Sequence, residues 1–300
     1  MQSIEIRPFR RSDREQLTAL VNTHVGAVVP GVSVSVNVLL SQLEREPEES
    51  VVDPWVAERR TLVALERSAV VGGAHLLRYG SGEPVGEAYR DVAELRWLVF
   101  TPAAAAAADA LLAASLEVMD GWRAAAQWAD GALPALGCYG VPAAWPHVRE
   151  AYVRAGFAFD GRVELVLVAR VDELPEPGPA PLERLSVRRE VGRFGTQFTG
   201  VLDGERVGFV DLDVDQTAGG TRSRLAGWSD VGDLCVAQAY RRRGVGTWLL
   251  GHAADWLRLG RVERLVDYAE PGQRDLLAFL EASGFRELSR TERGWARRTA

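Results

Sequence analysis

Residues 233–250 decide the fold, and they read Asp233-Leu234-Cys235-Val236-Ala237-Gln238-Ala239-Tyr240-Arg241-Arg242-Arg243-Gly244-Val245-Gly246-Thr247-Trp248-Leu249-Leu250. A strand leads into a turn with two spaced glycines, and an amphipathic helix follows. Such a turn exposes backbone N–H groups at a helix N-terminus, where an anion such as a pyrophosphate is favoured. Gly244 and Gly246 let a phosphate approach the backbone, and the arginines at 241–243 add positive charge with suitable geometry.

Two common phosphate-binding motifs are excluded. The turn lacks the Gly-Lys-Ser/Thr ending of a Walker loop, and its spacing is not that of a dinucleotide-binding GxGxxG, which also requires a suitably placed acid for the ribose. The sequence contains no lysine, so lysine-based chemistry is excluded too. The alternative for this segment is a solvated arginine cluster beside an ordinary turn.

The segment 241–246 resembles motif A of the GNAT acyltransferase superfamily, Arg/Gln-x-x-Gly-x-Gly/Ala. The resemblance implies an acyl-CoA, acetyl-CoA or a longer acyl donor, in a cleft between two splayed parallel strands. It implies that Leu234 and Val236 border the pantetheine arm. The pyrophosphate is expected at a set of turn residues: Arg241, Arg242, Arg243, Gly244, Val245, Gly246 and Thr247.

A second family motif occurs in both halves of the chain. Residues 279–285, Phe-Leu-Glu-Ala-Ser-Gly-Phe, resemble the end of motif B, Tyr-x-x-x-Gly-Phe, but Leu280 replaces the tyrosine. Residues 152–157 match it with Tyr152 in place. The first half nevertheless has alanines at 103–108 where the phosphate turn belongs, and these leave no open backbone nest. The first half is therefore expected to be a copy that does not bind the cofactor.

The predicted fold class is α/β with a mixed α+β sheet, as two tandem GNAT-like domains. Each is expected to have a mostly antiparallel sheet, one splayed parallel strand pair and flanking helices. Prolines alternate through 173–181, which favours a stiff, extended linker. The predicted domains are 1–172, degenerate and without a phosphate-binding turn, and 182–300, the catalytic, acyl-CoA-binding copy.

The element order is expected to repeat in the two domains. In the first we expect strands over 4–8, 61–66, 70–79, 94–100, 135–139 and 164–171, and helices beginning near 12, 36, 103 and 147. In the second we expect strands over 185–190, 196–201, 206–213, 233–236 and 264–268, and helices over 246–259 and 273–282. The second domain lacks the first two helices, which in the family usually wall the acceptor site. That site is therefore open, or closed by the first domain and the 216–229 loop. We expect closure by the first domain, because a copy held on a short proline-rich tether is well placed for it.

Three residues are candidates for proton transfer. Direct attack by an amine requires a base for the amine and an acid for the leaving thiolate, and in many family members the motif B tyrosine is the acid. Leu280 cannot do this. Tyr268, at the end of the adjacent strand, is the substitute considered, with a structural role as its alternative. Asp233 and Glu270 are the candidate bases, each with a solvated strand-end acid as the alternative.

Composition restricts the partners. The chain has 300 residues, a net charge of −6 and two cysteines, which indicates globular domains without a disulfide framework or a CxxC metal pair. No metal is expected. The charge argues against a nucleic-acid surface and favours cationic amines. No export signal or membrane span is found, so we expect a cytoplasmic protein; a homodimer is left open.

The expected function is acetyl-CoA-dependent N-acetylation of a small-molecule amine by direct attack in a ternary complex. Asp213, Asp215 and Trp228 are expected near the mouth of the acceptor site. Two alternatives stay open: a non-catalytic acyl-CoA sensor or scaffold, suggested by Leu280, and an N-acetyltransferase that acts on proteins.

Overall fold

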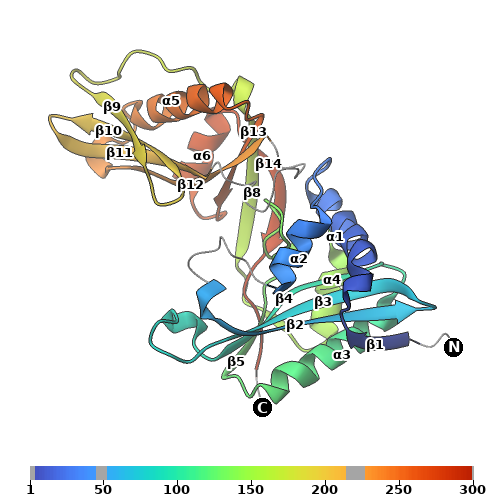
Figure 1. Ribbon diagram of the computed structural model, residues 1–300. Helices are drawn as coiled ribbons and strands as arrows, with labels where there is room; N and C mark the ends of the chain where they lie inside the picture. Colours follow the sequence, from blue (N-terminus) through green and yellow to red (C-terminus); the bar gives the residue numbers. More distant parts are fainter. Residues whose placement is uncertain (1–3, 45–52, 214–226, 299–300) are drawn as a thin grey trace. The chain divides into compact units, whose positions relative to one another are not determined.

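The computed structural model describes residues 4–44, 53–213 and 227–298. The chain forms two compact units (Figure 1). Unit 1 comprises Met1–Glu164 together with Ser289–Ala300, and unit 2 comprises Leu165–Leu288. Each unit is built on one mixed β-sheet, and each is described by itself below.

Unit 1 is built on a seven-stranded sheet in the order β1-β2-β3-β4-β5-β15-β7. Its strands are β1 (Ile4–Pro8), β2 (Val56–Glu66), β3 (Ala69–Tyr79), β4 (Val92–Phe100), β5 (Ala126–Ala129), β7 (Ala158–Phe159) and β15 (Trp295–Arg297). Its helices are α1 (Arg14–Val28), α2 (Val36–Glu44), α3 (Ala105–Gly121) and α4 (Pro146–Arg154). Only β4 and β5 pair in parallel among these strands, from Val92 opposite Ala126 to Leu95 opposite Ala129.

Helices cover both faces of the unit 1 sheet (Figure 1). The neighbouring glycines 72 and 73 of β3 show this, because successive strand residues point to opposite faces. A Cβ at Gly72 would meet Leu111 of α3, whereas a Cβ at Gly73 would meet Leu17 of α1. The α1 and α3 sides of the sheet are therefore both packed, which buries the apolar strand β4 on both faces.

Unit 2 repeats this sheet with fewer helices. The eight-stranded sheet has the order β6-β14-β8-β13-β12-β11-β10-β9. The strands of this sheet are β6 (Val141–Pro142), β8 (Val163–Arg170), β9 (Ser186–Val191), β10 (Thr196–Leu202), β11 (Glu205–Asp213), β12 (Trp228–Val236), β13 (Arg264–Ala269) and β14 (Arg286–Glu292). Among them, β6 and the part of β14 that pairs with it belong to unit 1. The helices are α5 (Val245–Leu259) and α6 (Arg274–Ala282). As predicted, β9 passes to β10 through a short loop, without the two helices that stand at this point of unit 1.

Each sheet contains strands from the other half of the sequence. β8 precedes the proline-rich segment in sequence but pairs with β13 in the second sheet. β15 is the last strand of the chain but lies between β5 and β7 in the first. The unit boundaries therefore differ from the expected ranges 1–172, 173–181 and 182–300. A single boundary at the proline-rich segment cannot describe the two units, since strand pairing is set by long-range contacts.

The proline-rich segment packs along α5 and belongs to unit 2. The Arg258 guanidinium donates to the Leu174 carbonyl at 2.7 Å, and the Trp248 indole N–H donates to the Gly178 carbonyl at 3.1 Å. A Cβ at Gly251 would lie 2.9 Å from the Glu176 carbonyl oxygen, so the backbone crosses the helix closely there. The segment that was expected to be a stiff, extended linker is thus a packed part of the second unit.

Most predicted elements are confirmed, with one exception in unit 1. Residues 135–139 are not a strand, and β5 lies earlier, at Ala126–Ala129. Pro134 interrupts the ladder, and Gly137 has a left-handed φ of 74°. The Leu133 N–H donates to the Cys138 carbonyl, so this segment closes into a tight turn. Among the described residues, no helix is long and apolar enough to cross a membrane.

Candidate active site

The strands β12 and β13 separate after a short parallel pairing. Trp228 lies opposite Arg264 and Asp230 opposite Val266, and the pairing ends there. The continuation of β12, with half-buried Leu234 and Val236, therefore runs beside β13 without hydrogen bonds to it. This is the splayed pair that the sequence predicted, and it leaves an edge of β12 open to an extended ligand.

The turn after β12 has the conformation of an anion-binding nest. Arg242 has a φ of 59°, and Gly244, at the N-cap of α5, has a φ of 81°. The first helical hydrogen bond runs from the Trp248 N–H to the Gly244 carbonyl. The N–H groups of residues 245–247 consequently have no acceptor within the helix. Their dipoles and the neighbouring arginines favour an anion at this end of α5.

Some residues of the turn hold its backbone in place, and others are exposed to solvent. The Arg241 side chain donates to the Val236 carbonyl at 2.9 Å and so ties the turn to β12. Val245 is buried, whereas Thr247 and the arginines 241–243 are exposed. A Cβ at Gly246 would lie 3.3 Å from the Phe279 ring of α6. Glycine at this position therefore relieves a tight approach of α6.

Four aspartates share the sheet face opposite α5. Asp211 pairs with Asp233 and Asp213 with Asp230 across β11 and β12. The bulge at Gly232 shifts the alternation by one residue, so that Asp230 and Asp233 point to the same face. In the described parts of unit 2, 165–213 and 227–288, no helix lies on this face. It is an acidic face beside the splay, on which Asp233 is exposed, Asp213 and Asp230 are half-buried and Asp211 is buried. The expected Asp215 and most of the 216–229 loop lie outside the described residues.

The β9–β10 loop, residues 192–195, closes one side of this acidic face. The Asp211 carboxylate, 1% exposed, accepts hydrogen bonds from the N–H groups of Arg193, at 2.8 Å, and Phe194. A Cβ at Gly232 would lie 2.5 Å from the Phe194 ring. The ring thus covers the bulge just before Asp233, where unit 1 has helices instead.

The candidate catalytic residues lie on two strands. Asp233 is exposed at the splay, on the acidic face. Tyr268 is half-buried and, by the parallel register with Asp230, lies on that face as well. Glu270 is exposed after β13, where its N–H donates to the side chain of Gln273 at the start of α6. Asp233 and Tyr268 are therefore brought to one face, and Glu270 belongs to the cap of α6.

Sequence reasoning missed Asp267. This aspartate is 7% exposed on β13, where it points to the face of Leu265, opposite to that of Tyr268. Burial raises its pKa to about 7, and the negative charge of Asp233 acts in the same direction. The Tyr268 N–H donates to its Oδ1 at 2.7 Å. The signal in the sequence was an acid between Val266 and Tyr268, inside an otherwise apolar strand.

Unit 1 differs from unit 2 at the position of Asp233 and at the turn before the helix. Its parallel register and bulge align Glu94 with Asp230 and Trp97 with Asp233. Trp97 is 0% exposed and donates to Gln42 of α2, so a bulky side chain fills the position of the open aspartate. At the helix end, α3 begins after Ala104 without a glycine turn.

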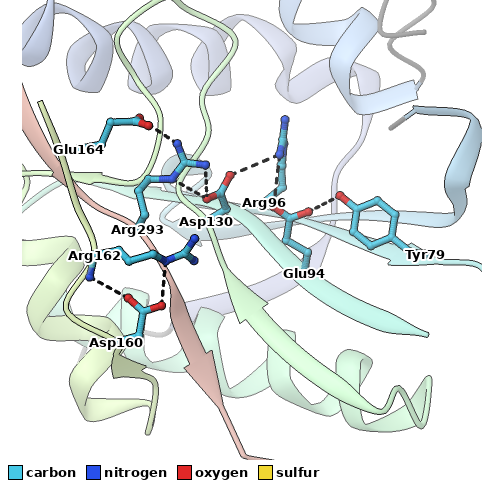
Figure 2. A network of polar contacts seen from close by, with 8 residues as sticks. All are labelled: Tyr79, Glu94, Arg96, Asp130, Asp160, Arg162, Glu164 and Arg293. Carbon is cyan, nitrogen blue, oxygen red and sulfur yellow. Dashed lines mark hydrogen bonds and ion pairs between the residues drawn. The ribbon is translucent and has the colours of Figure 1, made fainter. Parts of the chain in front are cut away.

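A polar network occupies the centre of unit 1 (Figure 2). Arg96 contacts Glu94 at 3.3 Å and Asp130 at 3.5 Å, and Arg293 contacts Asp130 and Glu164 at 3.1 Å each. The Tyr79 hydroxyl donates to Glu94. Burial raises the pKa of Glu94, against the charge of Arg96. In unit 1 these acids are paired with arginines, whereas Asp233 of unit 2 is exposed.

Comparison with solved structures shows the fold. A "Tandem GNAT protein from the clavulanic acid biosynthesis pathway (without AcCoA)" matches with a TM-score of 0.68 and 16% identity, over 98% of this chain and 97% of that one. A GCN5-related N-acetyltransferase from Sphaerobacter thermophilus matches at 0.64 and 12%, over 98% and 94%. A glucosamine N-acetyltransferase region of a fungal multi-domain GH3 beta-N-acetylglucosaminidase matches at 0.66 and 15%, over 99% of this chain and 38% of that one. The chain therefore has the fold of a tandem GNAT protein.

The sequence comparison identifies the second unit. Residues 165–285 match the acetyltransferase (GNAT) family, and this range contains the splay, the turn, the four aspartates and Asp267. Unit 2 is thus a GNAT domain, of a family of acyltransferases. No curated protein matches the sequence.

Proposed function

We propose that this protein is an N-acetyltransferase that uses acetyl-CoA, or another acyl-CoA, to acylate a cationic small-molecule amine in unit 2. The observation that carries the proposal is the exposed turn 241–247, with its left-handed Gly244, at the end of a splayed strand pair within a GNAT domain. Unpaired N–H groups and arginines there suit a pyrophosphate. Unit 1 lacks such a turn, so one cofactor site per chain is expected.

The acceptor amine is expected on the acidic face. The negative charge of this face, with Asp233 as its exposed carboxylate, attracts an ammonium group, and electrostatic attraction of this kind raises the local concentration of a cationic substrate. Asp233, beside the open edge of β12, is the base that takes the proton from the attacking amine. Tyr268 on the same face positions the amine, and Glu270 has no direct role. The open surface is also the feature that would admit a protein N-terminus.

Acyl-CoA binding is tested with a charge substitution in the first turn of α5 that is compatible with the helix. Thr247→Glu places an acid in the first turn of α5, where the helix dipole stabilises it, but next to the proposed pyrophosphate. Val191→Glu adds the same charge at a residue 93% exposed on β9, away from the turn. Calorimetric titration with acetyl-CoA is expected to find one site per chain, which Thr247→Glu abolishes and Val191→Glu retains. Two sites, or equal affinity in both variants, contradict the proposal.

Acyl transfer is tested by thiol release over a set of amines. Dicationic amines are expected to react faster than neutral or carboxylated ones, and Asp233→Asn is expected to lower kcat by about 10²- to 10⁴-fold, the usual contribution of a general base. Binding of acetyl-CoA without thiol release for any amine or peptide N-terminus would instead favour the non-catalytic sensor, which is the reading that Leu280 supports.

A further inference from the structure

We propose that Asp267 is the proton donor for the departing thiolate in unit 2, in place of the tyrosine that Leu280 replaces. This inference rests on the proposed acyl transfer. It assigns the acid of the reaction to a residue of strand β13 rather than to helix α6. The structural basis is a comparison of the two units at the same two positions.

The two motif B helices end in the same way. In unit 1 the Phe157 N–H donates to the Tyr152 carbonyl, and in unit 2 the Phe285 N–H donates to the Leu280 carbonyl, both at 3.0 Å. Each helix is followed by a glycine with a left-handed φ. Tyr152 and Leu280 therefore occupy equivalent positions, and the loss of a hydroxyl in unit 2 is a real substitution and not a shift in alignment.

The strands next to these helices differ in the opposite way, because the polar residue is on the strand of unit 2. In the parallel pairing, Glu94 lies opposite Trp128 just as Asp230 lies opposite Val266. The next residue is Ala129 in unit 1 and Asp267 in unit 2. Unit 1 thus has a tyrosine on its helix and an alanine on its strand, whereas unit 2 has a leucine on its helix and an aspartate on its strand.

Both positions lie on one face of the sheet. In unit 1 the Tyr152 ring packs edge-on against Trp295, with 5.8 Å between ring centroids, and Trp295 is the cross-strand neighbour of Ala129. In unit 2 the neighbour of Asp267 at the same place is Leu167 of β8. The helix face of β13 therefore presents a carboxyl group where the helix no longer presents a hydroxyl.

The surroundings of Asp267 suit a proton donor. Its cross-strand neighbour Leu167 is 2% exposed and brings no charge. Of the charged groups in the described residues, Asp233 acts on it, and the effect raises its pKa. A buried carboxyl group near an anionic one keeps its proton close to neutral pH. Asp267 on the helix face and Asp233 on the acidic face thus stand on the two sides of the splay.

In the proposed step one bond forms, one bond breaks and two protons move. The amine nitrogen forms a bond to the acyl carbon, the C–S bond breaks, and its electron pair goes to sulfur. The proton of the Asp267 carboxyl group moves to this sulfur and leaves a carboxylate, while Asp233 takes the proton that the amine nitrogen loses. Exchange with water then returns Asp267 to the acid and Asp233 to the base for the next turnover.

Binding of coenzyme A itself tests the proposal without an acceptor. Calorimetry compares coenzyme A with desulfo-coenzyme A at pH 6 and pH 8, for the wild type, Asp267→Asn and the control Asp255→Asn, at an exposed acid of α5. In the wild type, the affinity of coenzyme A relative to desulfo-coenzyme A is expected to change by about tenfold between the two pH values, because the group that faces the sulfur changes from a proton donor to a hydrogen-bond acceptor. Asp267→Asn removes this difference, and Asp255→Asn keeps it.

Turnover provides the second measurement. With an amine that releases thiol, Asp267→Asn is expected to lower kcat by about 10²-fold or more, to leave the KM for the amine unchanged and to remove the decline of kcat above pH 7. If coenzyme A binds but the three proteins share one pH dependence, Asp267 is not the donor and the proposed function stands. If the wild type does not bind coenzyme A, both are overturned.

Discussion

Replacement of Asp267 by asparagine is expected to change how the stability of unit 2 depends on pH. The pKa of this carboxyl group is about 7 in the folded protein and 3.8 in its ordinary state. Between these two pH values the folded protein keeps a proton that the unfolded chain has released. The free energy of unfolding therefore falls as the pH rises from about 4 to 7, and stays level above pH 7. A shift of about three units corresponds to about 4 kcal/mol in total.

The assay is hydrogen exchange of the α5 amides at pH 5 and pH 8, corrected for the intrinsic exchange rate, because it reports on unit 2 by itself. Between these pH values the wild type is expected to lose about 3 kcal/mol, the part of the shift that lies above pH 5. Asp267→Asn should lose far less and should be the more stable protein at pH 8. The control is Asp255→Asn, at an exposed acid of α5. Equal pH dependence in the wild type and Asp267→Asn would refute the burial argument.

Further substitutions test the packing and hydrogen bonding of individual residues. Gly251→Ala should destabilise the protein and release the proline-rich segment to proteolysis, because the new Cβ would lie 2.9 Å from a backbone carbonyl oxygen. The control Gly26→Ala, whose Cβ has nothing within 4 Å, should stabilise α1 by about 0.5–1 kcal/mol. Tyr152→Phe should leave acetyl-CoA affinity unchanged in calorimetry and raise the melting temperature slightly, since its buried hydroxyl has no hydrogen-bond partner. Gly232→Ala should displace the Phe194 ring, 2.5 Å from the new Cβ, and raise the KM for the amine without changing acetyl-CoA affinity.

The phosphate turn was predictable because its function depends on contiguous residues. A strand, two glycines and an amphipathic helix within 18 residues fix the local backbone, and the structure confirms the left-handed Gly244. The same holds for the motif B helices, which both end at a glycine with positive φ. The absence of two helices between β9 and β10 could also be predicted from the sequence, since the loop is too short to hold them.

The acidic face was only partly predictable. Asp213 and Asp233 were singled out, but period-2 counting puts Asp230 and Asp233 on opposite faces. The bulge at Gly232 reverses this, and a bulge is set by the pairing of β12 with β11 rather than by the sequence of β12 alone. Asp267 was missed for a related reason, since its burial depends on β8, a strand placed about 100 residues earlier in the chain.

By itself, the sequence determined the repeated element order, the phosphate-binding turn in the second half and its loss in the first, because these features follow from local periodicity, glycine placement and side-chain volume. The tertiary structure decided where the units divide, since β8 and β15 pair with strands that are distant from them in the sequence. It also decided which acids share a face and which one is buried. Cross-strand register and burial arise from contacts between distant segments, and no local pattern encodes them.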